Sequence, residues 1–354
     1  MNYLSLKELT SSLGEYPNQE ETRAQLTQCL QKTTKGNKPF LDASFSDGET
    51  SINLKIWEDR PCFAILSQLP PKSFVSLSGE WAKNAYGIDA NHLEVRLLSD
   101  EEKDILLAGS PALQKKQAID LQEIKQLLAE MSDPRIKAVC QLFLETCGDR
   151  FKRAGAARTY HHARRGGLVE HVAGMMRTSK AICSVNPQLN CDLLLAGCLF
   201  HDCGKLWENS YPENDFTMPY SEVGELLGHI SLGIELINSL WKIVLSKPEA
   251  SEWKTLDPSS NAVRLHLLHM VASHHGELAF GSPVVPKTPE AMALHYIDNL
   301  DAKLEMFKNT YETSEYLGPN VVQRKNPLPA NIVTPLAHVS LSANDETSDQ
   351  LNLD

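Results

Sequence analysis

The chain has 354 residues, of which 42% are hydrophobic and 22% are charged, close to ordinary globular usage. This length predicts about two domains at roughly 150 residues each. No run of about 18 uncharged apolar residues is present that could span a bilayer. These values argue against a single small module, a wholly disordered chain and a membrane protein.

The charge balance is acidic, with 34 Lys and Arg against 45 Asp and Glu and a net charge of −11. A general coat of polyanion around the protein is therefore not expected. Any nucleic acid must instead be held by a local basic groove or through metal ions that cancel the field of the protein.

Two further features bear on the compartment. The first ten residues lack the basic, apolar and small-residue order of a secretory signal. The eight cysteines include no Cys-x-x-Cys pair, so reduced, buried thiols are favoured over a disulfide framework or a zinc knuckle. A cytoplasmic protein is the expectation.

Between about residues 20 and 99, apolar and polar residues alternate with the period of half-buried strands. Positions 41–45 and 52–56 show this pattern on either side of a turn signal at 46–49, which predicts a hairpin. Positions 75–79 and 93–97 repeat it, and residues 61–69 fit a short helix. About five strands with one helix between the third and the fourth favour a small closed barrel, of which the oligonucleotide/oligosaccharide-binding (OB) barrel is the commonest.

After Ser99 the composition becomes helical, and this character continues to about Lys308. We expect residues 1–99 to form the OB-like β-barrel, with an extension before about residue 20, and residues 100–150 to form a linker and helical connector. Residues 151–310 would form an all-α domain, and residues 311–354 an acidic, flexible tail. The predicted fold class is multidomain α+β.

Eleven of the twelve histidines follow residue 160, and most of them fall in the helical half. Imidazole nitrogens and carboxylate oxygens that converge from separate helices suit a borderline or hard divalent ion. The adjacent His201 and Asp202 can serve one ion because Gly204 ends their helix, so that neighbouring side chains can point the same way. The residues singled out are His171, His201, Asp202, His229, His274, His275 and Asp298.

The order of one His, a His-Asp pair and a distant Asp resembles the HD superfamily of metal-dependent phosphohydrolases, and the match extends to Gly204-Lys205. The resemblance implies an HD-type domain at residues 151–310 whose metal ligands are His171, His201, Asp202 and Asp298. It places His229 and one of His274 and His275 where binuclear members have additional ligands. The alternative for the first four residues is that they are polar groups paired within the core. The alternative for His229 and for His274 or His275 is that they support ligands by hydrogen bonds or contact phosphate.

The resemblance therefore implies two divalent ions bridged by Asp202. Mn²⁺ is favoured, with Fe and Mg²⁺ as alternatives, because mixed imidazole and carboxylate sites do not choose strongly among these ions.

The resemblance narrows further when the predicted barrel, the helical linker, the run from Tyr160 to His171 and the segment 186–190 are taken together. This arrangement, over about residues 36–308, is similar to the YhaM-type 3′→5′ exoribonucleases. It implies a phosphodiesterase that shortens single-stranded RNA, with DNA also open, to nucleoside 5′-monophosphates. The alternative is an HD-type phosphohydrolase acting on a small cyclic or linear nucleotide, and a third hypothesis is a nonenzymatic nucleic-acid-binding protein with a structural metal site.

Basic and aromatic residues supply the candidate substrate contacts. Asp202 and Lys205 are the catalytic candidates. Lys205 lies one turn from the metal pair and would bind phosphate. Arg164 and Arg165 form either a solvated face or an entrance that tracks phosphates towards the site. Phe40 and Trp57 fall on the polar phase of their strands, where they would stack on bases or pack against the helical domain.

Three nearby residues are less determined by the sequence. Asp301 is interpreted as structural or as a support for a ligand, and His161 and His162 stay undecided. The expected partner is single-stranded nucleic acid, with RNA favoured and no membrane, and a homo-oligomer stays open.

Overall fold

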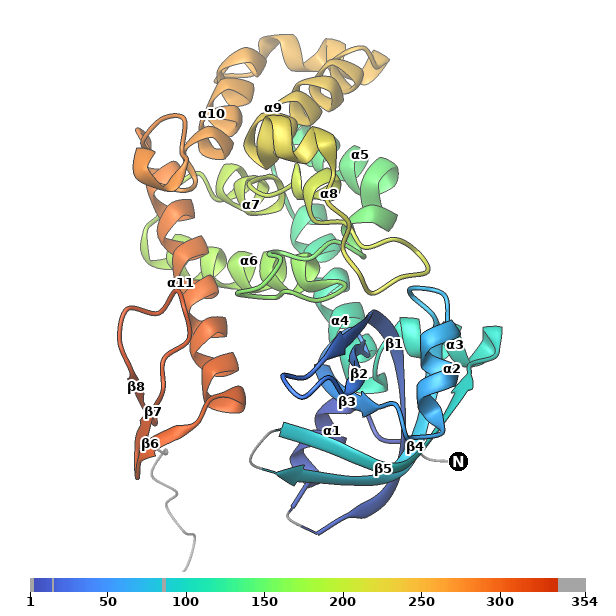
Figure 1. Cartoon of the computed structure of the whole chain (residues 1–354). Coiled ribbons are helices and arrows are strands. Elements are labelled where there is room, and N and C mark those ends of the chain that lie inside the picture. The colour runs from blue at the N-terminus through green and yellow to red at the C-terminus, as the bar shows by residue number, and fades with distance from the viewer. Residues whose placement is uncertain (1–2, 15, 85–86, 337–354) are drawn as a thin grey trace, which may run out of the picture. The chain divides into compact units, whose positions relative to one another are not determined.

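The structure is a computed structural model that describes residues 3–14, 16–84 and 87–336. The chain divides into two units, Met1–Glu305 and Met306–Asp354. The first unit contains an N-terminal sheet followed by helices, in the order that the sequence predicts (Figure 1).

Five strands form one antiparallel sheet in the order β3-β2-β1-β4-β5. Alternate residues of β2 and β3, such as Leu41, Ala43 and Leu54, are buried in a single core, which confirms the period-two pattern. One short helix, α2, separates β3 from β4. The bounds are β1 (Asn18–Thr33), β2 (Pro39–Ser46), β3 (Ser51–Trp57), α2 (Cys62–Gln68), β4 (Phe74–Asn84) and β5 (Gly87–Leu97).

The prediction of a closed barrel is not confirmed, because the hydrogen-bonded order of the described strands ends at β3 on one side and β5 on the other. The long strand β1 pairs with β4 over residues 18–25 and with β2 over residues 25–33. Its register shifts between Leu26 and Gln28, and such an irregularity bends a strand. The sheet thus curves around its core at β1 without pairing its edges.

The N-terminal extension belongs to this sheet domain. Helix α1 (Leu6–Ser12) begins with a capping box of Ser5 and Glu8. Its residues Leu6 and Leu9 are fully buried in the core of the sheet. The extension therefore adds apolar packing to the sheet core, which its sequence did not indicate.

Helices make up the rest of the first unit. Most begin at a Ser, Asp or Asn whose side chain accepts a hydrogen bond from the first turn, as at Ser99, Asp133 and Asn190. No helix among the described residues is long and apolar enough to cross a membrane. The bounds are α3 (Asp100–Ala108), α4 (Pro111–Ala129), α5 (Pro134–Phe151), α6 (Gly167–Val185), α7 (Cys191–Phe200), α8 (Lys205–Glu208), α9 (Glu222–Leu245), the 3₁₀ helices η1 (Pro248–Thr255) and η2 (Leu278–Phe280), α10 (Ser260–Ser273) and α11 (Pro289–Thr313).

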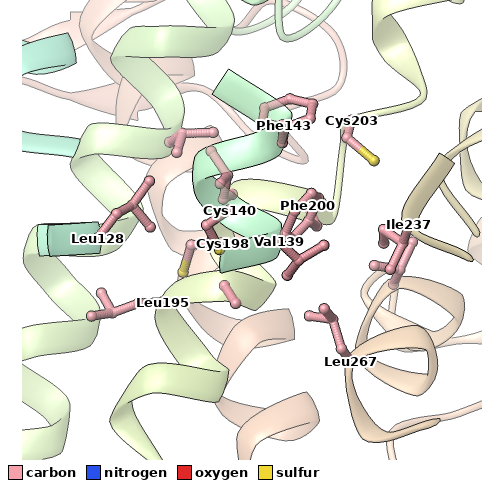
Figure 2. Packing of buried hydrophobic residues seen from close by; sticks show 14 of the residues in the cluster. Leu128, Val139, Cys140, Phe143, Leu195, Cys198, Phe200, Cys203, Ile237 and Leu267 are labelled. Carbon is pink, nitrogen blue, oxygen red and sulfur yellow. The ribbon is translucent and has the colours of Figure 1, made fainter. Parts of the chain in front are cut away.

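Helix α7 runs through the centre of the helical core. Every residue from Leu193 to Phe200 is buried, which a helix shows only when other helices surround it. The ring of Phe200 packs 5.2 Å from that of Phe143 on α5, and Figure 2 shows both among the residues of this core. The C-terminal end of α7 therefore lies deep inside the helical part.

All eight cysteines are free thiols, and Cys62, Cys140, Cys198 and Cys203 are buried. This agrees with the expectation that no disulfide framework holds the chain. Apolar packing and hydrogen bonds supply the stability instead.

The second unit holds the end of α11 and a small antiparallel sheet in the order β6-β7-β8. Its strands are β6 (Tyr316–Gly318), β7 (Val321–Val322) and β8 (Ile332–Val333), and Tyr311 Oη donates to the Val333 carbonyl at 2.8 Å. The structure here differs from the expected flexible tail, because buried Val322 and Ile332 give the segment apolar contacts. Residues 337–354 of that expected tail lie outside the described residues.

Candidate metal centre

The histidines and aspartates of the predicted centre come from five helices and meet at the end of α7. His171 lies on α6, His201 ends α7, and His274 ends α10. His229 follows Gly228, whose φ of +68° and ψ of 160° break the helical path of α9 and turn the chain at that point. Asp202 and His275 follow their helices, and Asp298 lies on α11.

The first group surrounds His201. His171 Nε2 lies 3.3 Å from His201 Nε2 and 3.2 Å from Asp298 Oδ1. Asp202 Oδ2 lies 3.1 Å from His201 Nε2. Ligand atoms of His171, His201 and Asp202 lie within 4.8 Å of one another, and with Asp298 they form a set of possible ligands for one divalent ion.

The second group consists of His229, His274 and His275, each with a possible ligand atom within 4.8 Å of the others. The other carboxylate oxygen of Asp202, Oδ1, lies 3.5 Å from His229 Nε2 and 3.7 Å from His274 Nε2. Asp202 thus presents one oxygen to each group, which is the arrangement of a carboxylate that bridges two ions.

In each of the five imidazoles of these two groups, the Nδ1 atom is hydrogen-bonded within the protein. The carbonyls of Cys198 and Val271, each one turn earlier, hold Nδ1 of His201 and His274 at 2.9 and 2.7 Å, and the Phe280 carbonyl holds Nδ1 of His275. Carboxylates hold the remaining two, Asp301 at His171 and Glu208 at His229. Such bonds fix the ring and leave Nε2 free as a metal ligand.

The buried side-chain atoms that lack a hydrogen-bond partner among the described residues include Asp202 Oδ1 and His229 Nε2. Buried polar atoms are rarely left unpaired in folded proteins. A divalent ion between Asp202 and His229 would satisfy both atoms at once, so the residues present fit a metal.

The charges of the centre favour an ionised Asp202. Burial raises the pKa of a carboxyl group, but here the positive charge of Lys205 and the hydrogen bond with His201 outweigh it and hold the pKa of Asp202 well below its usual value. The pKa of Asp298 is also lowered, because its hydrogen bond with His171 outweighs burial. Burial lowers the pKa of His274 and His275, which keeps these rings neutral. Hydrogen bonds with Asp298 and Asp301 outweigh burial and raise the pKa of His171 to about 9, so an ion that binds its Nε2 would displace a proton.

Lys205 lies at the centre but is already engaged. Its Nζ donates to Asp202 Oδ2 at 2.6 Å and to the Ala156 carbonyl at 2.5 Å. An ammonium group has three donors, so one remains beside Asp202.

The contacts of Arg164 and Arg165 do not fit an entrance that binds phosphates. Arg164 binds both carboxylate oxygens of the buried Glu170 at 2.9 and 2.6 Å and also reaches Glu305. Arg165 donates to the carbonyls of Pro212 and Glu213. Arg164 therefore forms neither a solvated face nor an entrance for phosphates. Its charge is paired with Glu170, a buried acid that lies outside the basic run.

Phe40 and Trp57 are paired across β2 and β3 with ring centroids 5.5 Å apart. Both are half-buried and lie on the opposite face from Leu41 and Ile56. They are therefore not part of the metal centre, and the choice between base stacking and packing stays a prediction.

Three residues at the centre were missed or left undecided. Asp301 Oδ2 lies 2.7 Å from His171 Nδ1 and 3.1 Å from His162 Nε2, so this acid supports a ligand, one of its two suggested roles. Glu208 holds both the backbone N–H and Nδ1 of His229, and no motif marked it. The ring of His161 lies 5.5 Å from that of His171, and burial lowers its pKa to about 3, assisted by the charges of His171 and Lys205.

A comparison with known protein families gives a match, and it covers the metal centre. Residues 168–303 match the family model of the HD domain. This range contains both groups of histidines together with Asp202 and Asp298. Residues 168–303 are therefore similar to the HD domain, and this match indicates a metal-dependent phosphohydrolase.

Proposed function

We propose that the protein is a 3′→5′ exoribonuclease of the YhaM type, which degrades single-stranded RNA to nucleoside 5′-monophosphates. The observation that carries this proposal is the position of Asp202, whose two oxygens face two separate groups of histidines. A carboxylate between two ions about 4 Å apart is typical of enzymes that cleave phosphodiesters by in-line displacement.

Two divalent ions, when bound, supply a water nucleophile at neutral pH and neutralise charge on the scissile phosphate. His171, His201, Asp202 and Asp298 would hold the first, and Asp202 with His229, His274 and His275 the second. Mn²⁺ is the proposed metal, with Fe and Mg²⁺ as the other candidates.

Lys205 supports catalysis in two ways in this proposal. Its bond to Asp202 Oδ2 keeps the bridging carboxylate ionised. Its remaining donor would bind an oxygen of the phosphate as negative charge develops there.

The sheet domain would supply the grip on a strand. We propose that it is an OB-type domain and that the Phe40 and Trp57 pair stacks on bases, a contact worth about 1–3 kcal/mol per base. The free thiols suit a cytoplasmic protein.

A second candidate is hydrolysis of a small cyclic or linear nucleotide. It is favoured by the engagement of Arg164 and Arg165 in contacts within the protein, because this removes the basic path expected for a long strand. A small substrate would need only the metal centre and its nearest donors.

Substrate length separates the two candidates. The Mn²⁺-loaded protein would be given a 5′-labelled oligoribonucleotide, the same strand blocked by a 3′-phosphate, and cyclic and linear mononucleotides, with Asp202→Asn as the inactive control. We expect a ladder of shortened labelled strands and release of nucleoside 5′-monophosphates. Turnover of mononucleotides with the oligonucleotide left intact would reject the exoribonuclease and support the second candidate.

A further inference from the structure

The segment between α5 and α6 brings a further histidine to the metal centre. His162 has a φ of +44°, in the left-handed region that non-glycine residues seldom adopt. Contacts on both sides hold it there, since its Nε2 lies 3.1 Å from Asp301 Oδ2 and its carbonyl accepts from the Ala156 N–H. This fixed turn determines where its neighbour His161 lies.

The ring of His161 is nearly perpendicular to that of His162, at 86°, and lies 5.5 Å from the ring of His171. Its Nδ1 is buried and has no hydrogen-bond partner among the described residues. The five imidazoles of the two metal groups differ, because each has its Nδ1 held by a carbonyl or a carboxylate. An unpartnered buried nitrogen at such a site points to a group that binds there.

His161 does not belong to the metal ligands. Within the part of the chain that the structure describes, the groups of possible ligand atoms within 4.8 Å of one another include His171 and His201 but not His161. It therefore lies beside the candidate ligand His171, with ring centroids 5.5 Å apart, without belonging to a ligand group.

The other cations near the centre leave phosphate oxygens that His161 could bind. Arg164 is paired with Glu170 and Glu305, and Arg165 with backbone carbonyls. Lys205 keeps one donor. A phosphate has several oxygens to satisfy, and a neutral imidazole offers a donor without adding charge.

We propose that His161 is a substrate-binding residue whose imidazole donates a hydrogen bond to a non-bridging oxygen of the phosphate held at the metal centre. This inference deepens the proposed function and rests on it for the phosphodiester, but any phosphate bound at the centre would make the same contact. No bond is formed or broken at His161, which distinguishes its role from that of Asp202.

The test uses the full chain loaded with Mn²⁺ and inorganic phosphate as the probe. His161→Phe keeps a ring against His171 but removes the nitrogens, His161→Asn keeps an amide donor near the position of Nδ1, and the exposed His266→Ala is the matched control. Metal per chain is measured by elemental analysis, and the dissociation constant for phosphate by calorimetry.

We expect phosphate to bind the Phe variant about tenfold more weakly, the value of one hydrogen bond to a charged acceptor. The Asn variant should recover part of this loss, and the metal content should stay unchanged in all three. Unaltered phosphate affinity in the Phe variant, or loss of metal from both His161 variants, would overturn the proposal.

The role of His161 and the proposed function can fail independently of each other in this test. If oligoribonucleotides are not cleaved but the Phe variant binds phosphate weakly, the role of His161 stands and the exoribonuclease fails. If strands are cleaved with an unchanged KM and unchanged phosphate affinity in the Phe variant, the role of His161 fails and the enzyme remains.

Discussion

At the scale of single residues, hydrogen bonds within the protein orient the imidazoles of the centre. The Nδ1 atoms of His201 and His274 are held by carbonyls of their own helices, so the helix ends themselves set the ring orientation. His171 and His229 depend instead on distant carboxylates, Asp301 and Glu208. The metal affinity of the two groups should therefore respond to different outer residues.

Because Asp202 lies between the two groups of histidines, we expect it and His201 to be the most sensitive residues for hydrolysis. We expect His201→Ala and Asp202→Ala each to reduce hydrolysis to background, because each removes a ligand while the apolar core around α7 stays intact. Turnover and circular dichroism spectra would be measured in parallel, with His266→Ala as the control. A folded variant that retains wild-type turnover would reject the metal mechanism.

The number of ions follows from the two groups of ligands. We expect close to two metals per chain, falling to about one in the His229→Ala, His274→Ala double variant, because only the first group then remains. Hydrolysis should be lost with the second ion. Elemental analysis of the purified, reloaded protein measures the ratio.

The binuclear proposal would be abandoned if the unmodified protein held one ion and the double variant kept its activity. The protein would then be a phosphohydrolase with one metal.

Glu208 acts through His229 rather than on the substrate. We expect Glu208→Ala to weaken binding of the second ion about 10- to 100-fold, the usual effect of removing an acid that supports a metal-bound histidine. Glu208→Gln should weaken it less, because the amide oxygen can still accept from His229. Titration of metal into the metal-free protein would resolve two steps, and equal weakening of both steps would indicate a general loss of structure.

At the scale of helices, Glu170 joins α4 to α6 one residue before His171. Its carboxylate, fully buried, receives Arg164, Lys116 and Gln117. Burial alone would raise the pKa of this acid, but the hydrogen bonds with Arg164 outweigh it and lower the pKa to about 2. A buried acid with this many partners positions the start of α6 and thus the candidate ligand His171.

We expect Glu170→Gln to lower the free energy of unfolding by about 3 kcal/mol, since removing one partner of a buried ion pair leaves the other uncompensated. In the wild type the lowered pKa contributes stability above pH 4.5, and this is lost as the pH falls towards about 2. The Gln variant should lack that part of the acid dependence. Urea unfolding of the metal-free protein from pH 7 to pH 3 measures both effects, with the exposed Glu130→Gln as the matched control.

The helices also explain which parts of the site the sequence could predict. Gly204 and the wholly apolar run before His201 indicated a buried helix ending at the His-Asp pair, and the structure contains it. Glu208 carried no signal, and the partner of Asp301 could not be identified, because their histidines lie 21 and 130 residues away in the chain. The basic run at 150–165 indicated free cations, whereas Arg164 meets Glu170 and Glu305 only in the fold. Spacing along one helix is readable from the sequence, but pairing between helices is not.

At the scale of the whole first unit, the sheet domain contacts the segment that leads into α9. Phe216 packs against Phe74 with ring centroids 5.8 Å apart, and its N–H donates to Gln25 at 2.9 Å. Lys72 pairs with Asp215 in the same segment. Removal of residues 1–99 would therefore expose the buried Phe216 as well as remove any grip on a strand. A deletion cannot separate binding of nucleic acid from support of the segment before His229.

A double substitution on the outer face of the sheet makes that separation. We expect Phe40→Ala, Trp57→Ala to raise the KM for long single strands about tenfold or more, because each stacked base is worth about 1–3 kcal/mol. A dinucleotide or an activated phosphodiester should be hydrolysed as by the wild type, since the metal groups lie in the helical part. The two substrates would be compared at several salt concentrations, with the exposed Lys83→Ala as a control on the same domain. Equal losses on both substrates would mean that the pair stabilises the domain, and no loss on either would mean that a strand does not pass over this face.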